Sequence, residues 1–204
     1  MIKAADSGAL ILTSNKRLAR HLRTVFDNEM LQQGKTAWTT PQIVSLDGWL
    51  RKSLAELGED WRLLDGFPAV RLWEQVIEAD SSGSDLELLQ VSATARKARE
   101  AHQLLIEYRC QLSGLPLTAD QQAFQRWRTS YQEACRQQHW LDSAELPGLV
   151  LRAIEDRRLP FPKQLLLTGF DQWGPTLEGL QRTVEGQGGL VEVIAPSPPA
   201  TAGA

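Results

Sequence analysis

Apolar residues form short unbroken runs near both ends of the chain. The run GALILT at 8–13 is too short for a helix and is bounded by Gly and polar residues, so it predicts a buried strand. PQIVS at 41–45 predicts a second strand, with its Pro at the first position, where no ladder donor is needed. QLLLTG at 164–169 predicts a third strand, and the alternating run GLVEVIA at 189–195 predicts a fourth.

Helical periodicity follows the first three of these runs. A helix is predicted after the first strand, capped by Ser14 or Asn15 and ended by Gly34. Further helices are predicted directly after the second strand and from Pro175 after the third. Parallel strands need crossover helices, so a strand–helix–strand unit at each end of the chain predicts one parallel sheet. The predicted fold class is therefore α/β.

The middle of the chain shows helical periodicity alone for about a hundred residues. Three capping patterns mark expected helix starts within it: Ser84 with Glu87, Thr118 with Gln121, and Asp142 with Glu145. We therefore expect a large all-α insertion in a discontinuous sheet domain. The expected boundaries are 1–51 and 161–196 for the α/β domain, 52–160 for the insertion, and 197–204 for a Pro- and Ala-rich linker.

Composition excludes several classes of protein. No run approaches the roughly 20 apolar residues that span a bilayer, so no membrane association is expected. Cys110 and Cys135 have no CxxC partner, which argues against a disulfide framework or a zinc site and favours a reducing cytoplasm. His21, His102 and His139 have no Ser or acid at triad or ligand spacing. We expect no catalytic residues, no metal and no cofactor.

Charge is unevenly distributed, although the net charge is only −3. Residues 1–36 carry six Lys/Arg against three Asp/Glu, residues 55–90 carry two against nine, and residues 91–140 carry seven against four. Such segregation can mark one surface that meets phosphate, or it can reflect solvated helix faces that differ by chance. Both interpretations stay open.

The most suggestive segment is LILTSNKRLARHL at 10–22. A strand that passes through hydroxyls and cations into a helix places free backbone amides and positive charge at a helix N-terminus, which suits a phosphate group. The segment is not a P-loop, because no glycine lies between Gly8 and Gly34. The alternative is a capped surface helix with a basic face. The candidate contacts are Thr13, Ser14, Asn15, Lys16, Arg17 and Arg20.

A second segment, LLLTGFDQWGPTLEGL at 165–180, delivers Asp171 just past the end of a buried strand. Sheets of this class hold ligands at that place, and a Walker B strand also ends in an acid that holds Mg²⁺. Only one acid follows the strand here. An N-cap or turn aspartate before Pro175 is therefore favoured over metal binding.

These two segments, in this order around a helical insertion, resemble a known family. The chain is similar to the N-terminal region of AddB-type helicase–nuclease subunits and of related bacterial proteins described as probable DNA repair proteins. TSNKRLARHL at 13–22 resembles the segment after an early strand in UvrD-type helicases, where a Thr/Asn/Lys cluster lies against single-stranded DNA. TPQIVSLDGWL at 40–50 resembles the next strand and helix, and 165–180 resembles the segment that replaces the Walker B motif in AddB-like chains.

The resemblance implies a P-loop-NTPase-like sheet domain, as in domain 1A of superfamily-1 helicases, with 52–160 as its inserted subdomain. It also implies a longer parent chain with a PD-(D/E)xK exonuclease domain. The ATP-gripping loop is missing and Asp171 stands alone at the degenerate Walker B position, so this segment is expected not to hydrolyse ATP. The implied partners are single-stranded or duplex-end DNA, and either the C-terminal domains of the parent chain or a partner helicase subunit.

Two other functions remain open from the residues alone. The chain contains seven tryptophans without a fixed period, and tryptophan is most often a core or interface anchor. The Trp-rich helical block is thus an alternative candidate for a protein-interaction module that does not bind DNA. An exposed Trp can instead stack on a nucleic-acid base. A nucleotide-binding enzyme with an unusual phosphate site is the third possibility, which calorimetry with Mg-ATP would test.

Overall fold

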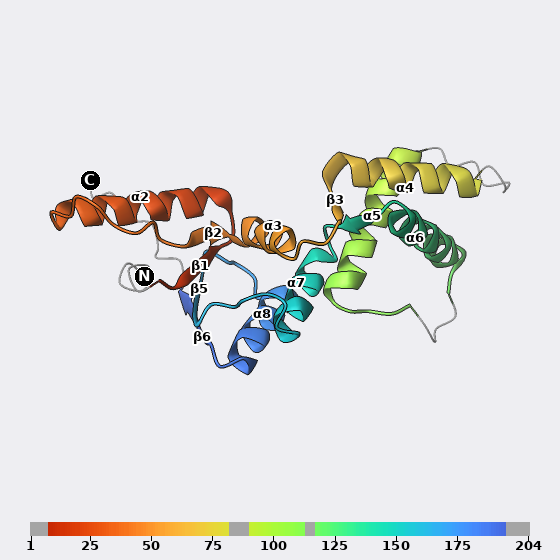
Figure 1. The fold of residues 1–204 in the computed structure, drawn as a ribbon. Helices are drawn as coiled ribbons and strands as arrows, with labels where there is room; N and C mark the ends of the chain where they lie inside the picture. Colours follow the sequence, from red (N-terminus) through yellow and green to blue (C-terminus); the bar gives the residue numbers. More distant parts are fainter. Residues whose placement is uncertain (1–7, 82–89, 113–116, 195–204) are drawn as a thin grey trace. The chain divides into compact units, whose positions relative to one another are not determined.

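The computed structural model describes residues 8–81, 90–112 and 117–194 (Figure 1). The chain forms two compact units. The first, here called the sheet unit, contains Met1–Gly58 and Gly148–Ala204; the second, here called the helical unit, contains Glu59–Pro147. Each is described by itself.

The sheet unit is built on four parallel strands in the order β2-β1-β5-β6 (Figure 1). The strands are β1 (Leu10–Thr13), β2 (Ile43–Ser45), β5 (Gln164–Thr168) and β6 (Leu190–Ile194). All four predicted strands are therefore present, and the predicted parallel sheet is confirmed. Thr13 pairs in register with both Ser45 and Thr168, so the carboxyl ends of three strands lie in a row.

Helices cover both faces of this sheet (Figure 1). On one face, α2 (Lys16–Gln32) packs Leu22 and Phe26 against Ile11. The other face carries a separate core formed by residues of α3 (Leu46–Glu56), α7 (Leu146–Glu155) and α8 (Pro175–Gly186). Since β1 and β5 are buried on both faces, their sequences are unbroken apolar runs, which is typical of parallel sheets.

The start and end of α2 follow the predicted capping pattern. Asn15 is the N-cap, and its Oδ1 accepts a hydrogen bond from the Leu18 amide at 2.9 Å. The helix ends at Gln32, and Gly34 follows with a φ of 74°. This left-handed conformation is one that Gly adopts without a Cβ clash, so Gly34 stops the helix as predicted.

The helical unit contains α4 (Gly66–Ser81), α5 (Val91–Glu107) and α6 (Ala119–Gln137). Trp73 and Tyr131 lie at its core, where their rings stack at a centroid distance of 4.4 Å. The capping box of Thr118 and Gln121 is confirmed at the start of α6. That of Asp142 and Glu145 is wrong, because Asp142 ends β4 and the next helix, α7, begins only at Leu146. The proposed box of Ser84 and Glu87 lies outside the described residues, as does the predicted linker 197–204.

The prediction that 52–160 is all-α is wrong, because β3 (Arg62–Leu64) and β4 (Trp140–Asp142) form a parallel pair in the helical unit. Each strand has only three residues, too few to show a period-two pattern. The expected boundaries at 52 and 160 also differ from those of the two units. Residue 52 falls inside α3, whose Leu46 and Trp49 pack in the core of the sheet unit.

No helix in the described ranges is both long and apolar enough to cross a membrane.

Candidate functional site

The sheet unit has a topological switch point between β1 and β5. From β1 the chain passes through α2 to β2 on one side, whereas from β5 it passes through α8 to β6 on the other side. Open α/β sheets bind ligands at the carboxyl ends of the strands at such a point. Two segments meet there: residues 13–17, called the β1–α2 junction, and residues 169–174, called the β5–α8 loop.

Hydrogen bonds fix the backbone of the β1–α2 junction. Thr13 is fully buried, and its Oγ1 donates to the Asn15 carbonyl at 2.8 Å, so this side chain holds the turn and does not face solvent. The Ser14 amide donates to the Thr168 carbonyl at 3.3 Å. The Ser14 and Asn15 side chains are exposed and bond to each other at 3.1 Å. Thr13 is therefore a positioning residue, while Ser14 and Asn15 are accessible.

Three exposed cations lie in the first two turns of α2: Lys16 and Arg17, which belong to the β1–α2 junction, and Arg20. No acid lies in the first turn of this helix. A cation there is unfavourable by about 0.3–1 kcal/mol, because the N-terminus is the positive end of the helix dipole. Within the described ranges, the Arg17 and Arg20 side chains make neither an ion pair nor a hydrogen bond. These two guanidinium groups remain available to an anion from outside the chain.

Lys16 differs from the two arginines because it has an acidic neighbour that sequence reasoning missed. Its Nζ lies 3.7 Å from Oδ2 of Asp47, and Nε of Arg51 lies 2.7 Å from Oδ1 of the same carboxylate. Both side chains of the Lys16–Asp47 pair are more than half exposed, so water and salt weaken the attraction. The register of Thr13 with Ser45 explains the contact, because it sets the starts of α2 and α3 side by side.

The β5–α8 loop begins in contact with the junction. Gly169 has a φ of 78°, and a Cβ there would lie 2.3 Å from Cδ2 of Leu18 and 3.1 Å from Oγ of Ser14. Glycine thus allows both the backbone turn and the close approach.

Asp171 is exposed within this loop, and the N-cap of α8 is Gly174. The interpretation of Asp171 as an N-cap is therefore wrong; the residue lies in a bend of the loop. Across the described ranges, no group of three or more His, Cys, Asp or Glu side chains is arranged to hold a metal ion.

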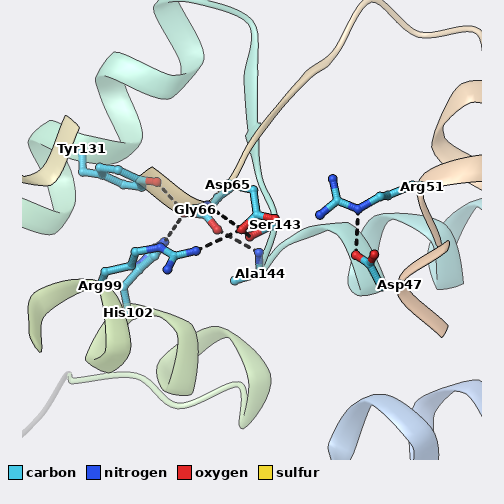
Figure 2. A network of polar contacts seen from close by, with 10 residues as sticks. Asp47, Arg51, Asp65, Gly66, Arg99, His102, Tyr131, Ser143 and Ala144 are labelled. Atoms are coloured by element: carbon cyan, nitrogen blue, oxygen red, sulfur yellow. Dashed lines mark hydrogen bonds and ion pairs between the residues drawn. The ribbon is translucent and has the colours of Figure 1, made fainter. Parts of the chain in front are cut away.

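The helical unit contains a buried polar network (Figure 2). The Tyr131 hydroxyl donates to Oδ2 of Asp142 at 2.5 Å, and the Ala144 amide donates to Oδ1 at 2.8 Å. Arg128 Nε donates to Nδ1 of His102 at 3.2 Å, so the imidazole proton is on Nε2. That Nε2 lies 3.9 Å from Asp142, which is too far for a hydrogen bond.

Burial dominates the chemistry of this network. It lowers the pKa of His102 to about 4, with a smaller effect in the same direction from the positive charges of Arg128 and Arg99, although Asp142 opposes the shift. Burial also raises the pKa of Tyr131. His102 is fully buried, so no substrate can reach it. The neighbours of His102 come from α6 and β4, distant parts of the sequence, so the spacing of residues around His102 could not reveal them.

A second part of the network joins the ends of β3 and β4 to α5 (Figure 2). Oδ1 of Asp65 accepts from Gly66 N at 2.7 Å, Ser143 Oγ at 3.1 Å and Arg99 Nη2 at 3.1 Å. A carboxylate with three donors on one oxygen is held in place by its own unit. We interpret the whole network as structural.

The chain matches no protein-family model, and no curated protein sequence matches it. The function is therefore inferred from the side chains at the strand ends of the sheet unit and from the resemblance of residues 13–22, 40–50 and 165–180.

Proposed function

We propose that the sheet unit is a non-catalytic, helicase-like domain of a bacterial DNA repair nuclease, and that its β1–α2 junction contacts the phosphate backbone of DNA. The observation that carries the proposal is the placement of Arg17 and Arg20. Both are exposed in the first two turns of α2, close to the topological switch point, and their guanidinium groups make no ion pair or hydrogen bond within the described ranges. A cation placed against the positive end of a helix does not stabilise that helix, so a phosphate ligand gives it a role.

Backbone chemistry at the same place supports phosphate binding. The first amides of a helix have no acceptor within the helix. Asn15 satisfies the amide of Leu18, which leaves those of Lys16 and Arg17 directed outward. Amides and cations together form a site for phosphate oxygens that does not read base identity.

The short connection between β1 and α2 also supports the proposal that this domain does not hydrolyse ATP. A P-loop wraps phosphates with several glycine-rich residues between strand and helix. Here only Ser14 and Asn15 separate β1 from α2. In the proposed P-loop-related fold, the loop has been replaced by a tight capped turn, and Asp171 is the only acid of the β5–α8 loop.

Anisotropy titrations with labelled single-stranded DNA at several salt concentrations test the proposal. Replacing Arg17 and Arg20 by Ala should reduce the steepness of the salt dependence by about 1.4, because each phosphate contact on a single strand contributes about 0.7. The matched control is Lys163→Ala/Arg182→Ala, which removes two exposed cations from the same unit. Lys163 precedes β5 and Arg182 lies near the C-terminal end of α8, so both are at the other end of the strands. Absence of binding at low salt, or equal losses in the two variants, would contradict the proposal.

One observation favours the alternative of a protein-interaction module in the helical unit. Leu104 and Tyr108 lie one turn apart on or just after α5, with 55% and 58% of their surfaces exposed. The tryptophans do not form this surface, because Trp73, Trp127 and Trp140 pack in the core. This alternative predicts association with protein that survives high salt and is lost on Leu104→Ser/Tyr108→Ser.

A further inference from the structure

Trp173 differs from the other six tryptophans of the chain. Five of them pack on the apolar cores: Trp38, Trp49, Trp73, Trp127 and Trp140. Trp61 donates from Nε1 to Glu59 at 2.6 Å, and its ring lies 6.4 Å from that of His139. Trp173 belongs to none of the cores and is 38% exposed, and its Nε1 has no hydrogen-bond partner in the part of the chain that the structure describes. A large apolar ring with a free polar edge is therefore open to solvent.

The backbone places this indole at the switch point of the sheet unit. Gly169 lies against Ser14 and Leu18, at the start of α2. Trp173 follows Gly169 by four residues, which span at most about 14 Å. Gly174, the next residue, begins α8. The indole therefore lies within a few nucleotide lengths of the exposed cations, given about 3.4 Å per nucleotide along a stacked strand.

The β5–α8 loop has the wrong charge for a second phosphate contact. Its exposed residues are Asp171, Gln172 and Trp173, so it carries a negative charge and no cation. The carboxylate repels the backbone, so the aromatic face of Trp173 is the largest favourable surface that this loop offers to a nucleic acid. An aromatic ring beside a cationic track is the combination that holds single strands, with bases stacking on the ring.

We propose that Trp173 stacks on an unpaired base of the strand whose phosphates lie at the β1–α2 junction. This inference rests on the proposed function and narrows its ligand to single-stranded DNA, because duplex bases already stack on their neighbours and are not free to stack on the indole. Arg17 and Arg20 in α2 supply a salt-dependent attraction to phosphates, and Trp173 in the β5–α8 loop supplies a salt-independent attraction to a base.

The test compares three strands: labelled oligothymidine, an abasic strand of the same length, and oligothymidine annealed to its complement. The abasic strand keeps every phosphate and offers no base. The chain should bind oligothymidine about 5- to 150-fold more tightly than the abasic strand, which is the range of one stacking contact. Trp173→Ala should reduce oligothymidine binding to the abasic level with an unchanged salt dependence, and Trp173→Phe should retain part of the preference.

The outcomes separate this inference from the proposed function. If oligothymidine binds and Trp173→Ala binds it equally well, or loses equal affinity for the abasic strand, stacking is overturned while phosphate binding stands. If the unaltered chain binds none of the strands at low salt, both are overturned. Circular dichroism melting of each variant checks that the fold is kept, which is expected for a substitution at an exposed loop residue.

Discussion

Both units of this chain place charged side chains at the carboxyl ends of parallel strands, but the two sets differ in their partners. In the helical unit, Asp65 and Asp142 follow or end β3 and β4, and their oxygens accept hydrogen bonds from the unit's own residues. In the sheet unit, Arg17 and Arg20 follow β1, and their guanidinium groups make no ion pair or hydrogen bond within the described ranges. Groups satisfied internally stabilise a fold, whereas groups left open are those that a ligand can use. We therefore assign a structural role to Asp65 and Asp142 and a binding role to Arg17 and Arg20.

The largest expected effect comes from breaking the buried network. Asp142→Ala leaves the Tyr131 hydroxyl and the Ala144 amide without their acceptor inside the helical unit. The lost bonds to a charged group, together with the unsatisfied donors, should lower the free energy of unfolding by about 4 kcal/mol. Urea denaturation measures this loss. The comparison is Asp171→Ala in the sheet unit, an exposed aspartate whose loss should change stability by less than about 0.5 kcal/mol.

Acid should weaken the same network. Burial holds the pKa of His102 at about 4 in the folded chain, below the value of about 6.5 that is usual for histidine, so the unfolded chain binds the proton first as the pH falls. The stabilisation is fully present above pH 6.5 and is lost as the pH falls towards 4. The difference corresponds to about 3 kcal/mol. Denaturation midpoints between pH 7 and 4 should fall, and His102→Gln should flatten that dependence. An unchanged slope in His102→Gln would show that other groups cause it.

The two units also differ in how much of their structure could be predicted from the sequence. The strands β1 and β5 are buried on both faces, so each appears in the sequence as an unbroken apolar run. The parallel sheet could then be predicted from the helices that separate the strands. The three-residue strands β3 and β4 carry no such pattern. They form because α6 brings β4 back beside β3, just before α4, and this contact between distant segments leaves no local pattern in the sequence.

The candidate site was predictable in position but not in its electrostatics. Ser14, Asn15, Lys16 and Arg17 form a contiguous segment after a strand, so they could be read directly. Asp47 could not be paired with Lys16, because the contact depends on the register of β1 with β2. His102 was missed for the same reason, since its neighbours Arg128 and Asp142 come from other elements.

A smaller effect on stability is expected at Gly169, where the β5–α8 loop contacts the β1–α2 junction. Gly169→Ala introduces a Cβ at a φ of 78° and 2.3 Å from Leu18, which should cost about 1–2 kcal/mol of stability. Gly186→Ala is the matched control, because it lies in α8 with open space around it and should be neutral or slightly stabilising. Thermal unfolding distinguishes them. Equal effects would show that Gly169 does not hold the loop against the β1–α2 junction.

The smallest expected effect on stability has the opposite sign. Arg17→Glu replaces an unfavourable cation in the first turn of α2 by a favourable acid, so the free energy of unfolding should rise by about 0.3–1 kcal/mol at low ionic strength. Urea denaturation at low and high salt measures the gain and its screening. Arg182→Glu in α8 serves as the comparison, because Arg182 is exposed and lies before the last turn of that helix; the change in stability should stay within about 0.5 kcal/mol.

The most direct test of the binding role is the affinity of Arg17→Glu for single-stranded DNA at low salt, measured on the same preparation whose stability has been determined. We predict a more stable protein that binds the strand more weakly, because Arg17 attracts a phosphate but destabilises the first turn of α2. Unchanged affinity, or a loss of affinity that accompanies a loss of stability, would contradict it.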